Sequence, residues 1–546
     1  MVLAVGLVAV GVCFAQELER ELILTRLEAL PERPLIGSAH VDDGRVLSAV
    51  YARRGFRPVW LRRSDADAFV SLVGRAEDEG LDPSDYHYQT LAQMLVERDS
   101  GRQSDMQLVE LDLLLTDSLL RYAYHLNFGK VDPNRLYPDW SLRRAIPGPD
   151  ALERLQSIID SDDPQGALAT SVPQSAYYET LKRSLKHHRT LREHGGWVQI
   201  PTGPALKPGT TDPRVRMLRE RLGAEVPSTP VPSAGPDWFD PALERVVSEF
   251  QTRHGLASDG MVGRATLAAL NVPVEARIEQ LRVNMERARW IFDDYEDTYL
   301  WVNIGAYEAA MYRGGRRIWS ARTVVGKPFR QTPVFKSKIT YLVFNPTWNV
   351  PPTILREDIL PSLKSDPDFL AKQNMRILDF KGNAVDATSI EWNAVGARNF
   401  PYMIRQDPGP ANALGQIKFM LPNPYFVYLH DTPQRELFLR PDRSFSSGCI
   451  RVDNVVDLAE LLLDDPHKWD HKTVVDAMQS GRTRSVSLAT PVTALVLYLT
   501  NEVDDLGNVQ FLGDVYARDG AVLEALNEPF VFSPPSGYDA RLPGER

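Results

Sequence analysis

At 546 residues, the chain is several times longer than a typical domain of about 100–200 residues, so we expect two to four domains. Its hydrophobic share of 43% and charged share of 25% are close to those of soluble globular proteins, which disfavours a disordered, collagen-like or polytopic membrane chain. The formal net charge of -10 gives no general electrostatic footprint for nucleic acid, and two cysteines exclude a disulfide framework and a cysteine-based zinc site.

Residues 1–16 form an uncharged apolar stretch that is too short to span a bilayer, which takes about 20 residues. The stretch has the length of the apolar region of a secretory signal peptide, with cleavage expected after Ala15, although the usual positive start is missing. We therefore expect an exported protein that loses residues 1–15. Export would leave Cys449 as the only thiol in an oxidising compartment. Such a cysteine is either an inert buried residue or a reactive nucleophile.

The segment 19–200 is expected to be a helical scaffold domain. Apolar residues follow a 3.6-residue period over 108–127, and 175–194 is a second amphipathic stretch. Loop signals such as Asp132-Pro133 separate the helical pieces. No residues in this segment have catalytic spacing.

A linker rich in proline and glycine at 201–209 leads to three short segments of helical character, 212–222, 241–254 and 263–271. Seven apolar residues could close a small three-helix core: Leu218, Leu222, Val246, Val247, Phe250, Leu267 and Leu270. The strings at 218–222, 250–256, 259–263 and 266–271, which read LRERL, FQTRHGL, DGMVG and TLAALN, resemble the peptidoglycan-binding three-helix module. The expected module covers 208–272, and a plain structural spacer is the alternative.

After a charged helix at 277–290, the hydrophobic period changes to two. Alternating apolar residues begin at Leu300 and again at Ile339, and a continuous apolar run contains Phe426 and Tyr428. These patterns predict a β-rich domain over 297–482, followed by a C-terminal extension at 483–546. The stretch 351–400 is polar and helical in character, and we interpret it as an insertion that forms a lid.

The residues that indicate chemistry are Tyr428-Leu-His-Asp-Thr-Pro433 and, twelve residues later, Ser446-Ser-Gly-Cys-Ile-Arg-Val452. His430 ends a predicted strand, and Cys449 lies at a turn before a predicted helix at 454–463, so the loop between them can bring the side chains together. An imidazole beside a thiol can take its proton, and the spacing suits a thiolate–imidazolium ion pair. Gly448 leaves room for a substrate carbonyl, and amides of a tight turn could face an oxyanion. Acyl transfer uses all of these features.

The two strings look like the active-site signature of the L,D-transpeptidase (YkuD-type) catalytic domain. The order of histidine before cysteine disfavours papain-like and NlpC-type peptidases. Further strings, at 51–60, 80–86, 347–351, 405–415 and 498–500, are similar to the large periplasmic, YcbB-type members of this family. The resemblance therefore implies a multidomain α+β protein with a helical scaffold, a peptidoglycan-binding module and a β-rich catalytic domain that carries an inserted lid.

Carried over position by position, the resemblance implies Cys449 as the acyl-enzyme nucleophile and His430 as its base and later acid. The backbone amides of Cys449 and Gly448 become the expected oxyanion donors. Many smaller members have glycine after the histidine, whereas Asp431 stands here. The group that orients His430 is left open between Asp431, a serine and a backbone carbonyl.

Further residues would shape the substrate pocket, namely Ser446, Ser447 and Arg451. The Arg451 guanidinium could pair with a carboxylate of the stem peptide, or it could form a structural salt bridge to an aspartate. Trp348 and Tyr428 either wall the substrate cleft or belong to the core.

The resemblance implies that the protein forms 3→3 cross-links between peptidoglycan stems in the periplasm of a Gram-negative bacterium, with release of D-alanine. It implies neither cofactor nor metal, no nucleic-acid partner, and covalent inhibition by carbapenems. HExxH and a glycine-rich phosphate loop after a strand are both missing from the sequence. The alternatives are L,D-carboxypeptidase action on the same tetrapeptide stems and a non-catalytic scaffold that binds peptidoglycan.

Overall fold

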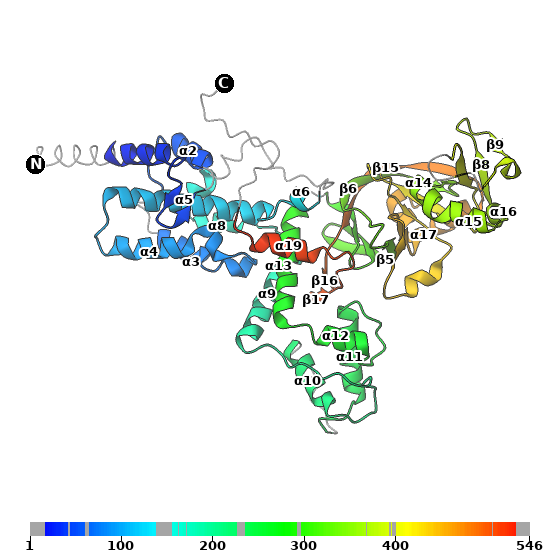
Figure 1. Ribbon diagram of the computed structural model, residues 1–546, viewed down its shortest axis with the longest axis horizontal. Helices are drawn as coiled ribbons and strands as arrows, with labels where there is room; N and C mark the ends of the chain where they lie inside the picture. Colours follow the sequence, from blue (N-terminus) through cyan, green and yellow to red (C-terminus); the bar gives the residue numbers. More distant parts are fainter. Residues whose placement is uncertain are drawn as a thin grey trace, which may run out of the picture.

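The computed structural model shows a helical body, a β-rich body and a small helical module that projects between them (Figure 1). It describes residues 17–41, 44–60, 65–137, 156–161, 163–170, 172–225, 235–291, 296–366, 368–392, 395, 400–504 and 506–530. The expected signal peptide, residues 1–15, lies outside these ranges. Among the described helices, none is long and apolar enough to cross a membrane.

The N-terminal body is helical, as the periodicity predicts. Its longest helix, α5 (Asp105–Phe128), begins with a capping box between Ser104 and Gln107, and it is buried on most sides. The other elements are β1 (Leu35–Ile36), β2 (Ala39–His40), α2 (Gly44–Arg53), α3 (Ala66–Val73), η1 (Ala76–Glu79), η2 (Pro83–Tyr86), α4 (Tyr88–Asp99), α6 (Pro133–Leu136), α8 (Pro164–Ala169) and α9 (Ala176–Glu193).

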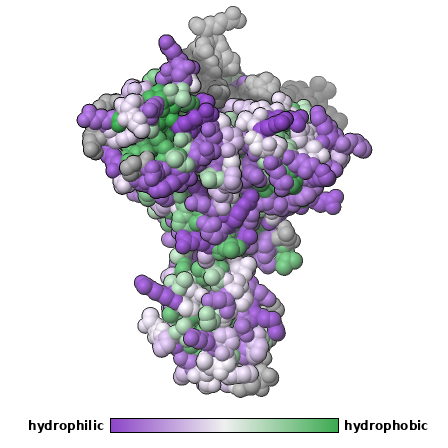
Figure 2. All heavy atoms as spheres, turned by 90° about the vertical axis from the view of Figure 1, so that its right-hand side faces the viewer, coloured by the Kyte–Doolittle hydropathy of each residue, from purple (hydrophilic) through white to green (hydrophobic). Residues whose placement is uncertain are grey.

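The small module consists of α10 (Arg214–Glu225), α11 (Pro241–Arg253) and α12 (Arg264–Leu270). All seven apolar residues predicted for its core lie in one hydrophobic cluster or pack against it. Asp240 caps α11 by accepting a hydrogen bond from the Leu243 amide. The space-filling view from the β-rich end shows the module as the narrower lower body (Figure 2).

Helix α13 (Val274–Ile291) connects the three bodies. The sequence predicts an apolar stripe on one face, but the helix is buried on nearly all sides because it packs against α5, α9 and α19 (Asp519–Asn527). Its buried charges have partners: Arg287 pairs with Asp519 at 2.6 Å, and Arg289 pairs with Glu286 at 3.1 Å. These charged residues of α13 are therefore paired inside the interface and do not face solvent.

The β-rich body is a nine-stranded sheet in the order β13-β5-β14-β12-β11-β6-β15-β3-β4. A further pairing between β4 and β5 closes the sheet on itself. The strands are β3 (Thr298–Asn303), β4 (Glu308–Arg313), β5 (Arg316–Gly326), β6 (Phe335–Phe344), β11 (Ile417–Met420), β12 (Leu429–His430), β13 (Ser444–Ser446), β14 (Ile450–Val452) and β15 (Arg484–Leu497). Helices α17 (Val455–Leu463) and α18 (His471–Gln479) complete the core, and η5 (Arg435–Leu439) lies in the loop after β12.

Three features of this body differ from the predictions. The predicted boundary at 482 is wrong, because β15 pairs with both β6 and β3 in the interior of the sheet. In β6, the alternation that begins at the buried Ile339 is not kept: Leu342 and Phe344 are buried, whereas Tyr341 and Val343 are only partly so. The reason is that the pairing of β15 with β6 shifts register between Ser487 and Val492, so the strand turns its other face to the core beyond that point. Phe426 lies outside any strand, with φ at 56° and 85% of its surface exposed.

The rest of the predicted C-terminal extension packs on the interdomain helix. β16 (Asn501–Val503) and β17 (Val509–Phe511) form a hairpin that contacts α9, and α19 packs against α13. In Figure 1, α19 is the red helix that crosses α13.

The predicted insertion is a subdomain with its own hydrophobic core and its own sheet, in the order β7-β10-β8-β9. The prediction of a purely helical segment is therefore wrong, because short strands alternate with short helices and pair with strands just outside 351–400. The elements are β7 (Trp348–Asn349), α14 (Pro352–Ile354), a π turn (Leu355–Ile359), α15 (Leu360–Ser365), α16 (Phe369–Lys372), β8 (Met375–Leu378), β9 (Ala384–Val385), η4 (Ala387–Ser389) and β10 (Met403–Gln406). They lie at the far right of Figure 1.

Candidate active site

His430 and Cys449 come from two neighbouring parallel strands. β12 ends at His430, and β14 begins one residue after Cys449. The register pairs Leu429 with Ile450 and His430 with Arg451. The loop between them therefore returns the chain to the start of β12, where the Ile450 amide, next to Cys449, donates to the Tyr428 carbonyl. One further strand, β14, separates the cysteine turn from the predicted helix.

The imidazole of His430 is oriented by a backbone carbonyl. Its Nδ1 atom lies 2.5 Å from the carbonyl oxygen of Asp431, which places a proton on Nδ1 and leaves Nε2 to accept one. The Asp431 carboxylate turns elsewhere: it accepts hydrogen bonds from the Gln416 amide and from Arg435. A side chain at Gly415 would collide with this carboxylate. The aspartate after the histidine is thus a buried structural group.

Burial keeps both members of the pair uncharged. His430 is 4% exposed, and burial together with the nearby Arg451 lowers its pKa to about 3. Burial also raises the pKa of the Cys449 thiol. These two shifts disfavour the expected thiolate–imidazolium ion pair in this conformation, because burial penalises both charges. Among the described residues, no hydrogen bond joins the thiol to the imidazole either.

Cations and a phenol surround the thiol. The Cys449 Sγ lies 4.0 Å from the Phe426 carbonyl oxygen, and the Tyr428 side chain lowers the pKa of the thiol against the effect of burial. Lys418 and Arg451 oppose the effect of burial and pull the pKa of the thiol downward. Lys418 pairs across the strands with His430, and its Nζ lies 3.6 Å from the centre of the Tyr428 ring. Negative charge on the sulfur would therefore meet two positive side chains.

The turn before the nucleophile is held by hydroxyl groups. Ser446 Oγ donates to the Cys449 carbonyl at 2.6 Å and accepts from the Gly448 amide at 3.1 Å. Behind the turn, Thr332 Oγ1 donates to the Gly448 carbonyl at 2.8 Å and accepts from the Gly326 amide at 2.9 Å. Gly448 has φ at 112°, a conformation that side chains rarely adopt.

This arrangement corrects the predicted oxyanion donors. The Gly448 amide is occupied by Ser446, so it cannot point at a substrate without breaking that bond. For the Cys449 amide, the structure gives no hydrogen-bond partner among the described residues. Of the two amides, only that of Cys449 can therefore donate a hydrogen bond to an oxyanion. Ser446 holds this turn through its hydroxyl.

Ser447 and Arg451 lie on either side of the nucleophile. Ser447 Oγ accepts a hydrogen bond from Arg330 at 2.7 Å. The Arg451 guanidinium donates to the Gln434 side chain at 2.6 Å, and its Nε atom is buried without a hydrogen-bond partner. No carboxylate pairs with Arg451 in the described part of the chain, so the alternative of a structural salt bridge finds no support there.

Trp348 and Tyr428 lie beside the thiol. Trp348 belongs to β7, at the start of the inserted subdomain, and is 9% exposed. Cys449 and Trp348 both affect the pKa of Tyr428, and the Tyr428 ring meets the His430 ring edge-on at 5.8 Å. Both aromatic residues therefore occupy the junction between the inserted subdomain and the catalytic sheet.

Three residues of this environment escaped the sequence interpretation: Arg330, Thr332 and Lys418. Each is brought to the site by strand pairing or by the loop between β5 and β6, and none stands in a motif. A lysine inside the apolar run of β11 is the only local signal.

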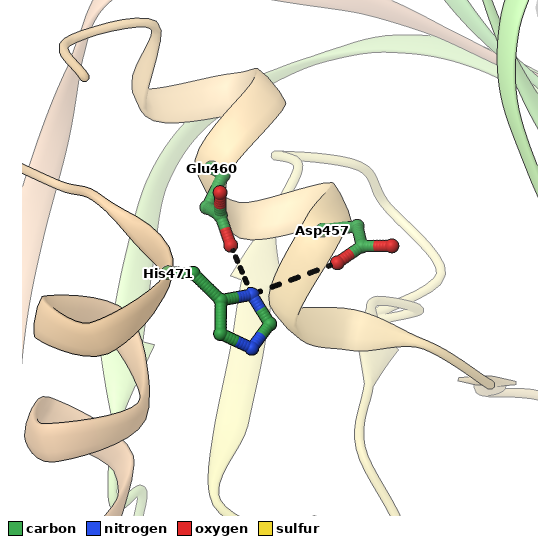
Figure 3. A group of neighbouring side chains, drawn as sticks. All are labelled: Asp457, Glu460 and His471. Carbon is green, nitrogen blue, oxygen red and sulfur yellow. Dashed lines mark hydrogen bonds and ion pairs between the residues drawn. The ribbon is translucent and has the colours of Figure 1, made fainter.

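A separate cluster joins Asp457, Glu460 and His471, and its candidate ligand atoms lie within 4.8 Å of one another. In Figure 3, His471 at the start of α18 points to both carboxylates of α17. Its Nδ1 lies 2.7 Å from Glu460 and 3.9 Å from Asp457. The imidazole is largely exposed, and its carboxylate contacts are those of a surface ion pair between two helices.

Comparison with protein families matches three parts of the chain. Residues 297–491 match the YkuD family, described as "L,D-transpeptidase catalytic domain". Residues 211–270 match "Putative peptidoglycan binding domain", and residues 45–185 match "Scaffold domain".

A relative from Haemophilus influenzae, described as "Putative L,D-transpeptidase", is 37% identical over 269 residues. The match covers 48% of this chain and 54% of the relative, so the chain spans about half the length of that protein.

Similar solved structures include an L,D-transpeptidase from Xylanimonas cellulosilytica, with 14% identity, a TM-score of 0.17 and coverage of 54% of this chain and 99% of that one. An L,D-transpeptidase from Stackebrandtia nassauensis has 12% identity, a TM-score of 0.22 and coverage of 53% and 94%. The family matches and the curated relative together show that this chain carries a YkuD-type L,D-transpeptidase catalytic domain at 297–491 and a peptidoglycan-binding domain at 211–270.

Proposed function

We propose that this protein is an exported, periplasmic L,D-transpeptidase that forms 3→3 cross-links between peptidoglycan stem peptides. The observation that supports the proposal best is that His430 ends β12 and Cys449 stands directly before β14, the neighbouring parallel strand, inside the matched catalytic domain. The small module over 208–272 would hold the enzyme on its polymeric substrate.

In the first step, the Cys449 sulfur attacks the carbonyl carbon between the L-centre of diaminopimelate and the terminal D-alanine of a donor tetrapeptide. The thiol proton moves to His430 Nε2 as the S–C bond forms, because burial disfavours both charges beforehand. The Cys449 amide supports the oxyanion, and Lys418 and Arg451 stabilise the charge that passes through the sulfur.

The tetrahedral intermediate then collapses. The C–N bond to D-alanine breaks, the imidazolium gives its proton to the leaving amine, and a thioester remains on Cys449. In the second step, an amine of another stem attacks the thioester carbonyl and loses a proton to His430. The new amide bond forms, and the sulfur leaves as the thiol. L,D-carboxypeptidase action differs only in that water takes the place of the acceptor amine.

The direct test is incubation of the purified full chain with disaccharide-tetrapeptide, followed by mass spectrometry. Dimers that lack one D-alanine support transpeptidation, whereas tripeptide alone supports hydrolysis. The control is Cys449→Ala, which should give neither product. If Cys449→Ala forms the same products as the natural chain, the nucleophile is assigned wrongly.

Thiol labelling separates catalysis from a passive role in wall binding. We expect Cys449 to react markedly more slowly in His430→Ala than in the natural chain, because the imidazole takes the thiol proton as the new bond to sulfur forms. Equal and sluggish labelling of both proteins would favour the non-catalytic scaffold. Exposure to a carbapenem should add one inhibitor mass at Cys449, and peptide mapping would locate it.

A further inference from the structure

One arginine connects the inserted subdomain to the active-site turn. Arg330 lies in the loop between β5 and β6, and its guanidinium reaches both sides. Nε and Nη2 donate to Glu357 Oε2 at 3.1 and 2.6 Å, and Nη1 donates to Asp358 Oδ2 at 2.7 Å. Nη1 also donates to Ser447 Oγ at 2.7 Å, two residues before Cys449.

The partners of Arg330 belong to parts of the chain that are otherwise separate. Glu357 and Asp358 lie in the π turn of the inserted subdomain. Ser447 lies in the turn that presents the nucleophile. Only the planar fork of an arginine, with its five donors, can satisfy all three groups together. The Arg330 side chain is 11% exposed, although the two carboxylates are 37% and 46% exposed.

The backbone that carries Arg330 is firmly attached to the catalytic body. The Arg330 amide donates to the Lys327 carbonyl, and the Lys327 amide donates to the Ser446 carbonyl at 3.0 Å. Thr332, two residues later, is fully buried and bound to Gly448. The contact with the inserted subdomain, in contrast, consists of the side chain and its charges.

The inserted subdomain has a second attachment, where its two connecting strands enter and leave. Asn412 Nδ2 donates to the Pro346 carbonyl at 3.1 Å, so the two connections lie together. Asn345, next to this point, has φ at 46°. A subdomain with its own core that is held in part by exposed ion pairs can pivot on its connecting strands when those pairs break.

We propose that Arg330 is a positioning residue: it latches the inserted subdomain to the active-site turn, and release of the latch admits the acyl acceptor. The inference rests on the proposed function, because an acceptor exists only for an enzyme that forms a thioester. Arg330 would act on two steps through two contacts, on acylation through Ser447 and on acceptor entry through Glu357 and Asp358.

The primary experiment is hydrogen–deuterium exchange of the full chain, read on peptides that cover 350–366. Arg330→Gln should raise exchange there by about tenfold, the size expected when several charge-assisted contacts at a partly exposed site are lost. Arg330→Lys should restore part of the protection, because a compact ammonium keeps the charge but lacks the wide planar fork that reaches both Ser447 and the two carboxylates. The matched control is Arg376→Gln, which removes another ion pair of the same subdomain, with Asp407, and should leave exchange within about twofold of the natural chain.

Two further variants divide the roles of the latch. Glu357→Gln combined with Asp358→Asn should raise exchange and change the apparent KM for the acceptor while leaving the rate of acylation by a carbapenem unchanged. Ser447→Ala should slow acylation and leave exchange unchanged. Arg330→Gln should show both effects. A purely structural arginine would not produce this split.

The proposal is overturned if exchange over 350–366 in Arg330→Gln stays within about twofold of the natural chain, or if Arg376→Gln raises it equally. Should Arg330→Gln fail to fold, the Glu357→Gln and Asp358→Asn double variant carries the same test, because it keeps Arg330 and its bond to Ser447. Exchange does not depend on activity. If the natural chain forms no cross-links but Arg330→Gln still loses protection over 350–366, the proposed function is refuted. The role of Arg330 in holding the inserted subdomain is then still supported.

Discussion

Thr332 and Arg330 stand two residues apart on one loop, yet they hold their partners in opposite ways. Thr332 is fully buried, and its hydroxyl forms neutral hydrogen bonds to Gly448 and Gly326. Arg330 forms charged contacts with partly exposed carboxylates of the inserted subdomain. Buried neutral bonds are not exposed to competing water or salt, whereas exposed ion pairs are. The comparison indicates that the turn before Cys449 is held permanently, whereas the inserted subdomain is held reversibly.

The largest effect is expected for Thr332→Val, which keeps the volume and removes the hydroxyl. The Gly448 carbonyl and the Gly326 amide would lose their partner, at a cost of about 1–3 kcal/mol for each group left unsatisfied. Carbapenem acylation of Cys449 should slow by about 10–100-fold, because a turn that shifts by about 1 Å loses its reactive geometry. Urea unfolding and adduct formation measure the two effects. The control is Thr340→Val, whose hydroxyl makes one long contact of 3.4 Å to Met420.

A smaller effect is expected for Tyr516→Phe, which weakens the same loop from the C-terminal side. The Tyr516 hydroxyl donates to the Gly326 carbonyl at 2.7 Å and accepts from the Thr332 amide at 3.1 Å. The ring would keep its stacking on Tyr498, but the Gly326 carbonyl and the Thr332 amide would each lose a partner, at about 1–3 kcal/mol for each group left unsatisfied, so the smaller effect is expected on acylation, because Tyr516 does not touch Gly448. Acylation should slow less than in Thr332→Val. A larger effect than that of Thr332→Val would mean that the hydroxyl of Tyr516, and not that of Thr332, governs the turn.

The third prediction concerns pH. The pKa of His430 is lowered from 6.5 to about 3, so the unfolded chain binds a proton more readily than the folded one. Stability from this residue is present above pH 6.5 and falls as the pH drops toward 3. His430→Gln should therefore lose less stability between pH 7 and about 4.5, by on the order of 2 kcal/mol, in urea unfolding. The pKa values of His188 and His254 are lowered too, so a reduced slope remains. An unchanged slope would contradict a buried, neutral His430.

The smallest effect is expected from salt. Raising the ionic strength from about 0.05 to 0.5 M should increase exchange over 350–366 about twofold, because exposed ion pairs are screened. Peptides that cover 444–452 should not change, since neutral buried bonds hold that turn. Exchange of the natural chain and of Arg330→Gln, measured side by side at both salt concentrations, should converge at the higher one. Equal salt effects on both regions would remove the distinction between the two attachments.

The sequence predicted the parts of the fold that depend on local pattern. The helical periods over 108–127 and 212–271 appear as helices whose apolar residues lie in the cores. The two strings around His430 and Cys449 also lie close in space, because the two-residue strand β12 pairs side by side with β14. The boundary of the catalytic domain and the buried face of β6 were less predictable. The placement of β15 and the faces of β6 follow from pairing between strands far apart in the chain.

By itself, the sequence determined which residues can do chemistry here, because an unpaired cysteine beside glycine and serine and a histidine at a strand end are local features. The tertiary structure decided their state and their supports. Burial makes the pair neutral, the Asp431 carbonyl and not its carboxylate orients His430, and Ser446 occupies the Gly448 amide. Desolvation and hydrogen-bond geometry arise only when distant segments meet. For the same reason, Arg330, Thr332 and Lys418 could be found only in the folded chain.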